Sequence, residues 1–149
     1  LYTDSRWRPC PVDKVLKDGE KVTLGGTTLV ARHTPGHTPG CTTWTAKVTD
    51  GKSKKLVVVV GSPNVNPGYQ LVNNKVYPKI AKDFARTFKV LNSLKCDYFL
   101  GAHGNYYGMH AKYPKLKGAK VSPFIDPAGY RDYIELKEKA FRDKLAAQK

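Results

Sequence analysis

The sequence predicts an α/β (α+β) fold in which a sheet is flanked by helices. Three observations predict it. Four strand-like segments lie within the first sixty residues, and apolar residues recur at helical spacing in two later segments. A short apolar segment typical of a strand lies between those two. The chain has 149 residues, about the length of one domain, so we expect residues 1–149 to belong to a single domain.

Turn-forming residues divide the first part of the chain into four expected strands. They are residues 20–24, 27–32, 42–48 and 56–60. Gly25-Gly26 joins the first two strands as a hairpin, and Asp50-Gly51 separates the last two. Residues 61–69 contain two prolines and two glycines, so we expect a long loop there.

In the second part of the chain, the spacing of apolar residues predicts two helices with a strand between them. Tyr77-Pro78 is expected to open the first helix, with the proline in its first turn. Its core face carries apolar residues at helical spacing: Ile80, Phe84, Phe88 and Leu91. Residues 96–101 form an expected buried strand. Asp126-Pro127 is a strong start for the second helix, whose apolar face carries Tyr130, Ile134, Phe141 and Leu145.

Composition argues against two classes of partner. The net charge is +14, but the lysines are scattered and no nucleic-acid motif accompanies them, so we expect a solvated basic surface rather than a nucleic-acid partner. No stretch approaches the roughly 20 apolar residues that span a bilayer, so no membrane partner is expected. Cys10, Cys41 and Cys96 form no C-x-x-C motif, and their pairing stays open between one disulfide and three thiols.

Two histidines share one sequence context. His37 lies in the Pro- and Gly-rich loop of residues 33–41 (HTPGHTPGC), and His103 lies in a Gly-flanked turn; each follows an expected strand. Loops on a rigid scaffold often carry functional side chains, and neutral imidazole is the commonest metal ligand. The alternative from spacing alone is that both histidines only hydrogen-bond within turns.

The chain resembles the C-terminal part of a metallo-β-lactamase-fold hydrolase, and subclass B3 metallo-β-lactamases in particular. The residues that carry the resemblance are 18–20 (DGE), 34–40 (TPGHTPG) followed by Trp44, Ser62, 67–69 (PGY), Tyr77-Pro78, 87–97 and 100–104 (LGAHG). The resemblance implies an αββα sandwich, with a mixed sheet flanked by helices. This chain would be the C-terminal part of that single domain.

The same resemblance implies a site with two zinc ions. His37 would complete the three-histidine set of the first zinc, and His103 would bind the second. The nucleophile would be a zinc-bound hydroxide rather than a side chain. Ser62 stands where related hydrolases have an Asp or a Cys ligand, so its hydroxyl and Asn64 would bind substrate instead. Tyr69 and Tyr106 are candidates for an apolar wall.

The chain departs from the family pattern in one respect. The H/Q-x-H-x-D-H cluster, which supplies the remaining zinc ligands, is absent, and we expect it to precede Leu1. Of the two other histidines, His33 is expected to be a structural loop residue or exposed, and His110 a surface residue. Since one ligand per metal is too few, we expect the isolated chain to be inactive. Because its inner sheet face would lack a partner, we also expect the chain to pair with the missing N-terminal half, to swap with another copy, or to be poorly soluble.

The resemblance therefore favours part of a zinc-dependent β-lactamase, periplasmic or secreted, that hydrolyses the amide bond of β-lactam antibiotics. One alternative is another hydrolase of the same fold, a lactonase or thioesterase, although Ser62 in place of an Asp argues against it. A second alternative, of a different class, is a non-catalytic basic interaction fragment.

Overall fold

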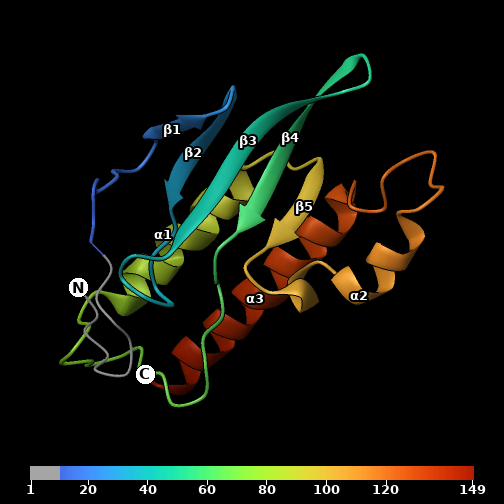
Figure 1. Cartoon of the computed structure of the whole chain (residues 1–149). Helices are drawn as coiled ribbons and strands as arrows, with labels where there is room; N and C mark the ends of the chain where they lie inside the picture. The colour runs from blue at the N-terminus through green and yellow to red at the C-terminus, as the bar shows by residue number, and fades with distance from the viewer. Residues whose placement is uncertain (1–10) are drawn as a thin grey trace.

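A computed structural model describes residues 11–149 and places their strands in one mixed sheet (Figure 1). The strands are β1 (Lys21–Leu24), β2 (Thr27–His33), β3 (Thr42–Asp50), β4 (Ser53–Val60) and β5 (Tyr98–Gly101). They lie in the order β1-β2-β3-β4-β5, antiparallel except for the parallel pair β4–β5. The predicted α/β fold, a mixed sheet flanked by helices, is confirmed.

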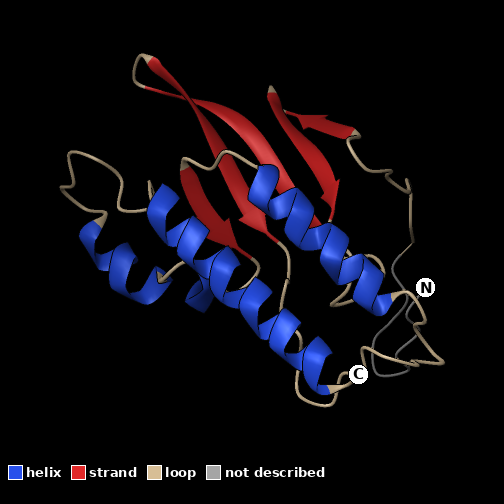
Figure 2. Cartoon of the chain, turned by 180° about the vertical axis from the view of Figure 1, so that it is seen from behind, coloured by secondary structure: helices blue, strands red, loops and turns tan. Residues whose placement is uncertain are grey.

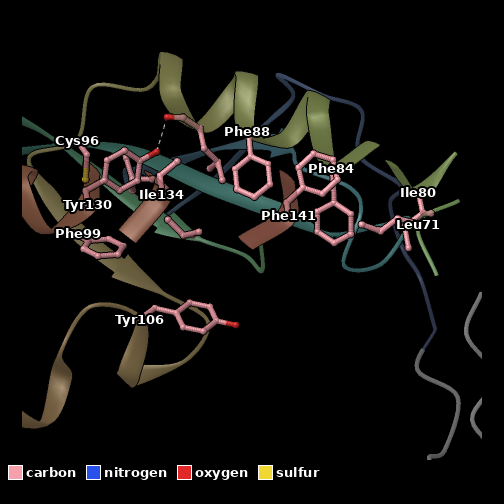
Figure 3. Packing of buried hydrophobic residues seen from close by; sticks show 13 residues of the cluster. Leu71, Ile80, Phe84, Phe88, Cys96, Phe99, Tyr106, Tyr130, Ile134 and Phe141 are labelled. Atoms are coloured by element: carbon pink, nitrogen blue, oxygen red, sulfur yellow. Dashed lines mark hydrogen bonds between the residues drawn. The ribbon is translucent and has the colours of Figure 1, made fainter. Parts of the chain in front are cut away.

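Two helices cover one face of the sheet, α1 (Ile80–Ser93) and α3 (Pro127–Ala147) (Figure 2). Between them and the sheet lies the core, where the rings of Phe84, Phe88 and Phe141 stack with centroids 5.4 to 6.5 Å apart (Figure 3). Val58 and Phe99 close the core from the sheet side. The apolar stripe of the first predicted helix is therefore core, as expected.

The first helix begins later than the sequence predicts. Pro78 lies in the turn before α1 rather than in its first turn. The side chain of Asn74 accepts hydrogen bonds from the backbone N–H groups of Val76 and Tyr77, which holds this segment as a turn. An Asn side chain that bonds its own neighbourhood competes in this way with helix formation.

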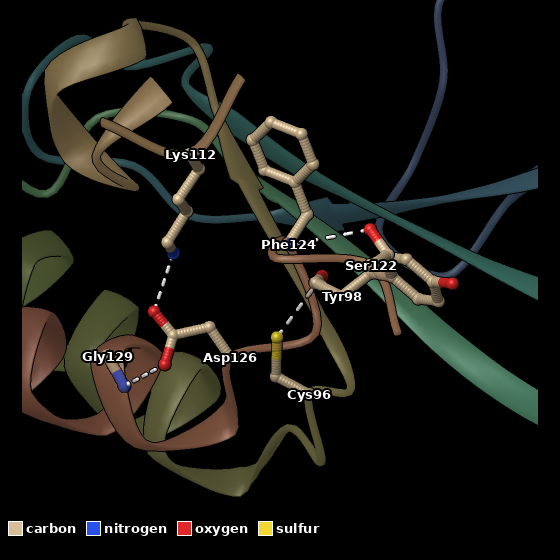
Figure 4. A network of polar contacts seen from close by, with 7 residues as sticks. All are labelled: Cys96, Tyr98, Lys112, Ser122, Phe124, Asp126 and Gly129. Carbon is tan, nitrogen blue, oxygen red and sulfur yellow. Dashed lines mark hydrogen bonds and ion pairs between the residues drawn. The ribbon is translucent and has the colours of Figure 1, made fainter. Parts of the chain in front are cut away.

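The outer edge of β5 is paired by the segment that leads into α3. The backbone N–H of Phe99 donates to Phe124 O at 3.0 Å, and Asp126 N donates to Asp97 O at 3.0 Å. Asp126 caps α3 by accepting from Gly129 N at 2.8 Å, as the sequence predicts. Its carboxylate also binds Lys112 Nζ at 2.6 Å (Figure 4). The ion pair ties the cap of α3 to α2 (Met109–Lys112), which lies between the 3-10 turns Gly104–Tyr106 and Tyr113–Lys115.

Two of the three cysteines are free thiols, Cys41 and Cys96, whereas Cys10 lies outside the described residues. Burial, and after it the carboxylates of Asp97 and Asp126, raise the pKa of Cys96 to about 12. That thiol therefore stays protonated and unreactive at neutral pH.

The face of the sheet opposite α1 and α3 carries an apolar patch. Strand register places two rows of side chains on it, Leu29–Ala46–Val57 and Ala31–Trp44–Val59. Side chains alternate along a strand, so Val58 and Val60 point the other way, into the core beneath the helices. Within residues 11–149 no helix covers this face (Figures 1 and 2). Nor is any helix of that part of the chain long and apolar enough to cross a membrane.

Candidate metal site at one edge of the sheet

Three loops leave the sheet at the same edge. Both β2 and β4 run antiparallel to β3, and β5 runs parallel to β4, so these three strands end on the same side. The loop after β2 carries His37, the loop after β4 carries Ser62 and Asn64, and the loop after β5 carries His103. The carboxyl ends of such strands are a frequent place for functional sites.

The loop that carries His37 is fixed against α1. Thr34 N donates to Cys41 O at 2.9 Å and closes the loop at its base. Thr87 Oγ1, from α1, donates to Pro35 O at 2.6 Å. Gly36 has a φ of +131°, and a Cβ at this position would lie 2.7 Å from the ring of Phe84. Only glycine fits this conformation and this approach to the helix, so Gly36 sets where His37 begins.

The imidazole of His37 is oriented by a neighbouring backbone. Its Nδ1 lies 2.9 Å from Asn64 O, and a carbonyl oxygen can only accept, so Nδ1 carries the proton. The lone pair of the neutral ring is then on Nε2, the atom left for a metal. The hydroxyl of Tyr69 donates to His37 O at 2.8 Å, which holds the main chain of the same residue.

Ser62 and Asn64 both bond to one tyrosine hydroxyl. Ser62 Oγ is buried and lies 3.2 Å from Tyr106 Oη, and Asn64 Nδ2 donates to the same oxygen at 2.7 Å. The backbone of Ser62 is held as well, since its N–H donates to the Cys41 sulfur at 3.1 Å. From the sequence, Tyr106 is a candidate only for an apolar wall of the site. No sequence pattern indicates that its hydroxyl bonds to the residue 62–64 loop.

The remaining histidines occupy different surroundings. His103 is exposed, and its ring packs edge-on against Tyr106 with centroids 5.1 Å apart. His33 Nε2 lies 2.8 Å from Pro39 O and so braces the base of the His37 loop. His110 is exposed on α2. The last two are therefore a structural residue and a surface residue, as the sequence indicates.

The described residues include side chains of a type that binds zinc, but too few of them are grouped to hold a zinc ion. Imidazole nitrogens are good zinc ligands, and His37 presents Nε2 in a fixed direction. Within residues 11–149, however, no three His, Cys, Asp or Glu side chains are grouped so that they could hold a metal ion. A catalytic zinc is held by about three protein ligands, so the described residues by themselves do not make a complete zinc site.

A cavity of about 410 Å³ opens beside His37. It is lined on one side by the His37 loop and on the other by residues 68–80, including Tyr69, Tyr77 and Ile80. Its volume lies within the range of small-molecule sites, and aromatic and aliphatic side chains line much of it. The cavity is large enough for a small organic molecule beside His37, but Ser62, Asn64 and His103 do not line it.

The chain is similar to several solved structures. It is 49% identical to the FEZ-1 metallo-β-lactamase from Legionella gormanii, with a TM-score of 0.93 over 98% of this chain and 56% of that one. It is 37% identical to BJP-1, a subclass B3 metallo-β-lactamase of Bradyrhizobium japonicum, with a TM-score of 0.88 over 98% and 56%. A metallo-β-lactamase from Cronobacter sakazakii is 38% identical, with a TM-score of 0.85 over 94% and 52%. No family model matches the chain. The chain spans about half the length of these structures.

Proposed function

The chain belongs to the subclass B3 metallo-β-lactamases, and from this premise we propose that it is part of a zinc-dependent enzyme that hydrolyses the amide bond of β-lactam antibiotics. The observation that carries the proposal is the geometry of His37. Its ring is held by Asn64 O so that Nε2 is free to bind a metal, at the sheet edge where His103 also lies. We expect such an enzyme to be periplasmic or secreted.

Each residue of the site has a role in this proposal. His37 would hold one zinc through Nε2 and His103 a second, with the other ligands supplied from beyond the described residues. Zinc bound there would act as a Lewis acid for the amide carbonyl. Ser62 and Asn64 would orient the substrate, either directly or through water, while they stay bonded to Tyr106.

The apolar face of the sheet supports the second part of the proposal, that this chain works with a partner. Leu29, Trp44 and Val59 share a face that no helix of residues 11–149 covers. Removal of such a surface from water contributes about 25 cal/mol per Å². We propose that the rest of the enzyme domain, or failing that a second copy of this chain, packs here.

The test is hydrolysis of the chromogenic cephalosporin nitrocefin by the full-length protein. We expect turnover that stops when a chelator removes zinc and returns when zinc is added. His37→Ala should lower kcat/KM by at least about 100-fold, because even changes to groups that orient zinc ligands cost 10- to 100-fold. His110→Ala, which removes an exposed histidine on α2, is the matched control and should leave kcat/KM unchanged.

Other outcomes would favour the alternatives. Zinc-dependent turnover of lactones or thioesters without β-lactams would replace the proposed substrate class. Absence of zinc binding by the full-length protein would favour a non-catalytic interaction fragment. For the 149-residue chain on its own, we expect a zinc titration to show no sub-micromolar binding, because the ligand set is incomplete.

A further inference from the structure

We infer that Tyr106 is a positioning residue that sets the orientation of both candidate zinc ligands, His37 and His103. Tyr106 follows β5 and is buried, with 9% of its surface exposed. Its hydroxyl reaches the residue 62–64 loop, and its ring makes a T-shaped contact with the ring of His103. The significance for zinc rests on the proposed function, whereas the orientation of His37 can be tested without metal.

The hydroxyl of Tyr106 reaches His37 through Asn64. Asn64 Nδ2 donates to Tyr106 Oη at 2.7 Å, and the main-chain oxygen of the same Asn64 accepts from His37 Nδ1 at 2.9 Å. The side-chain bond anchors residue 64, so the carbonyl that selects the tautomer of His37 is kept in place. Ser62 Oγ, 3.2 Å from the same hydroxyl, anchors the start of this loop.

The ring of Tyr106 reaches His103 directly. The two centroids are 5.1 Å apart with an interplanar angle of 66°, an edge-on contact. Behind it, the ring of Tyr133 stacks on Tyr106 at 5.1 Å. A Cβ on Gly101 would lie 3.0 Å from Tyr106 Cδ2, so the backbone of β5 also confines the ring. Tyr106 is therefore held on several sides and can act as a fixed reference for the two histidine loops.

The Tyr133 hydroxyl shows how closely this region is packed. It is buried and has no hydrogen-bond partner among the described residues. Its burial, and after it the neighbouring Tyr106, raise the pKa of Tyr133, so this hydroxyl stays neutral. Ser62 and Tyr106 are buried, and Asn64 and Tyr133 are half-buried, so the cluster is partly shielded from water, where a hydrogen bond is stronger than at the surface.

The experiment reads the tautomer of His37 in the zinc-stripped full-length protein by ¹⁵N NMR of labelled histidines, above the pH at which imidazoles are charged. In the parent protein His37 should carry its proton on Nδ1. Tyr106→Phe keeps the ring but removes the hydroxyl, and should shift a large part of the population to the Nε2–H form. Tyr130→Phe is the matched control, since it removes a buried tyrosine hydroxyl bonded to Leu91 O, away from the site.

A second variant separates positioning from general destabilisation. Asn64→Ala removes the same hydrogen bond from its other end and should produce the same tautomer shift. Because both changes break one link, the double variant should add nothing to either single variant. His37 remaining on Nδ1–H in folded Tyr106→Phe and Asn64→Ala would overturn the inference, as would an equal shift in Tyr130→Phe.

Zinc affinity, measured by competition with a chromophoric chelator, gives the second readout. Tyr106→Phe should weaken zinc binding by 10- to 100-fold, the usual cost of losing a group that orients a ligand. If the parent protein binds zinc and turns over nitrocefin but Tyr106→Phe leaves affinity and tautomer unchanged, the inference fails alone. If the parent protein binds no zinc, the proposed function fails, and the tautomer experiment still decides the role of Tyr106.

Discussion

Gly36 shows how one residue can place a functional side chain. It immediately precedes His37, and its φ of +131° is outside the range that other residues adopt readily. The missing side chain also lets the loop approach Phe84 on α1. The position of the imidazole therefore depends on a residue that itself carries no chemistry.

Gly36→Ala should destabilise the chain by about 2–4 kcal/mol, because it combines backbone strain with overpacking against a core ring. The measurement is the urea unfolding midpoint at constant slope. Gly40→Ala, in the same loop, is the control: a Cβ there meets nothing within 4 Å, so its effect should stay within about 0.5 kcal/mol. Equal losses from both variants would contradict this explanation.

The sequence singles out individual candidate residues more readily than their contacts. His37 and His103 stand out because each follows a strand in a Gly-containing loop, and the structure places both loops at one edge. The role of Tyr106 had no such signal. Its partners Ser62 and Asn64 lie more than 40 positions away, and a buried tyrosine has the same sequence pattern whether it packs or bonds.

Among the elements, α3 is stabilised at its start by a charge. Asp126 is the N-cap and also binds Lys112 at 2.6 Å, with both side chains less than a third exposed. Burial by itself would raise the pKa of Asp126. The hydrogen bonds from Lys112 and from Gly129 N outweigh it, so the pKa is lowered below its usual value. The charged carboxylate is thus favoured in the folded state.

This lowered pKa predicts a pH dependence of stability. A group whose folded pKa is depressed stabilises the fold above its unfolded pKa of about 3.9 and loses that effect as the pH falls through the folded pKa. Asp126→Asn keeps a capping side chain but removes the charge, so it should cost about 1 kcal/mol near neutral pH, a value reduced for solvent screening.

That difference between parent and Asp126→Asn should shrink below about pH 4, measured by urea unfolding from pH 7 to pH 3. Asp143→Asn, which breaks an exposed ion pair with Lys139, should cost less than about 0.5 kcal/mol at every pH. If the difference in unfolding free energy between the parent and Asp126→Asn grew as the pH fell, the predicted sign of the effect would be wrong.

The elements themselves were largely predictable, because hydrophobic period and turn residues act locally. Both long helices and all five strands of the described residues lie where the sequence placed them, with ends shifted by a few positions. The start of α1 was missed because a side chain, Asn74, competes for the backbone ahead of it. The short turns of helix between 104 and 115 were not predicted in full, since they have too few residues to show a period.

At the scale of the whole molecule, the two faces of the sheet have different surroundings. One face is packed under α1 and α3, while the other presents Leu29, Trp44 and Val59 without a covering helix in residues 11–149. Apolar patches of this kind mark interaction surfaces. The expectation that the chain pairs through this face follows from the sheet, whatever the partner is.

The 149-residue chain on its own should therefore associate as its concentration rises, which sedimentation velocity can measure. Leu29→Lys places a charge on this face, which no helix of residues 11–149 covers, and should weaken that association by about tenfold or more, since a buried unpaired charge costs over 1.4 kcal/mol. Leu136→Lys is the control, because Leu136 is also exposed but lies on α3. Equal dissociation by both variants would place the contact elsewhere.

The parallel pairing of β4 with β5 also governs the order in which the chain can fold. β1 to β4 are neighbours along the sequence, so they can associate through short-range turns and the His37 loop. β5 can join them only after the chain has passed through residues 61–97 and α1, a closure with a larger entropic cost. Long-range pairings of this sort form slowly. We therefore expect the two histidine loops to come together late in folding, once the longest-range strand pairing of the sheet has formed.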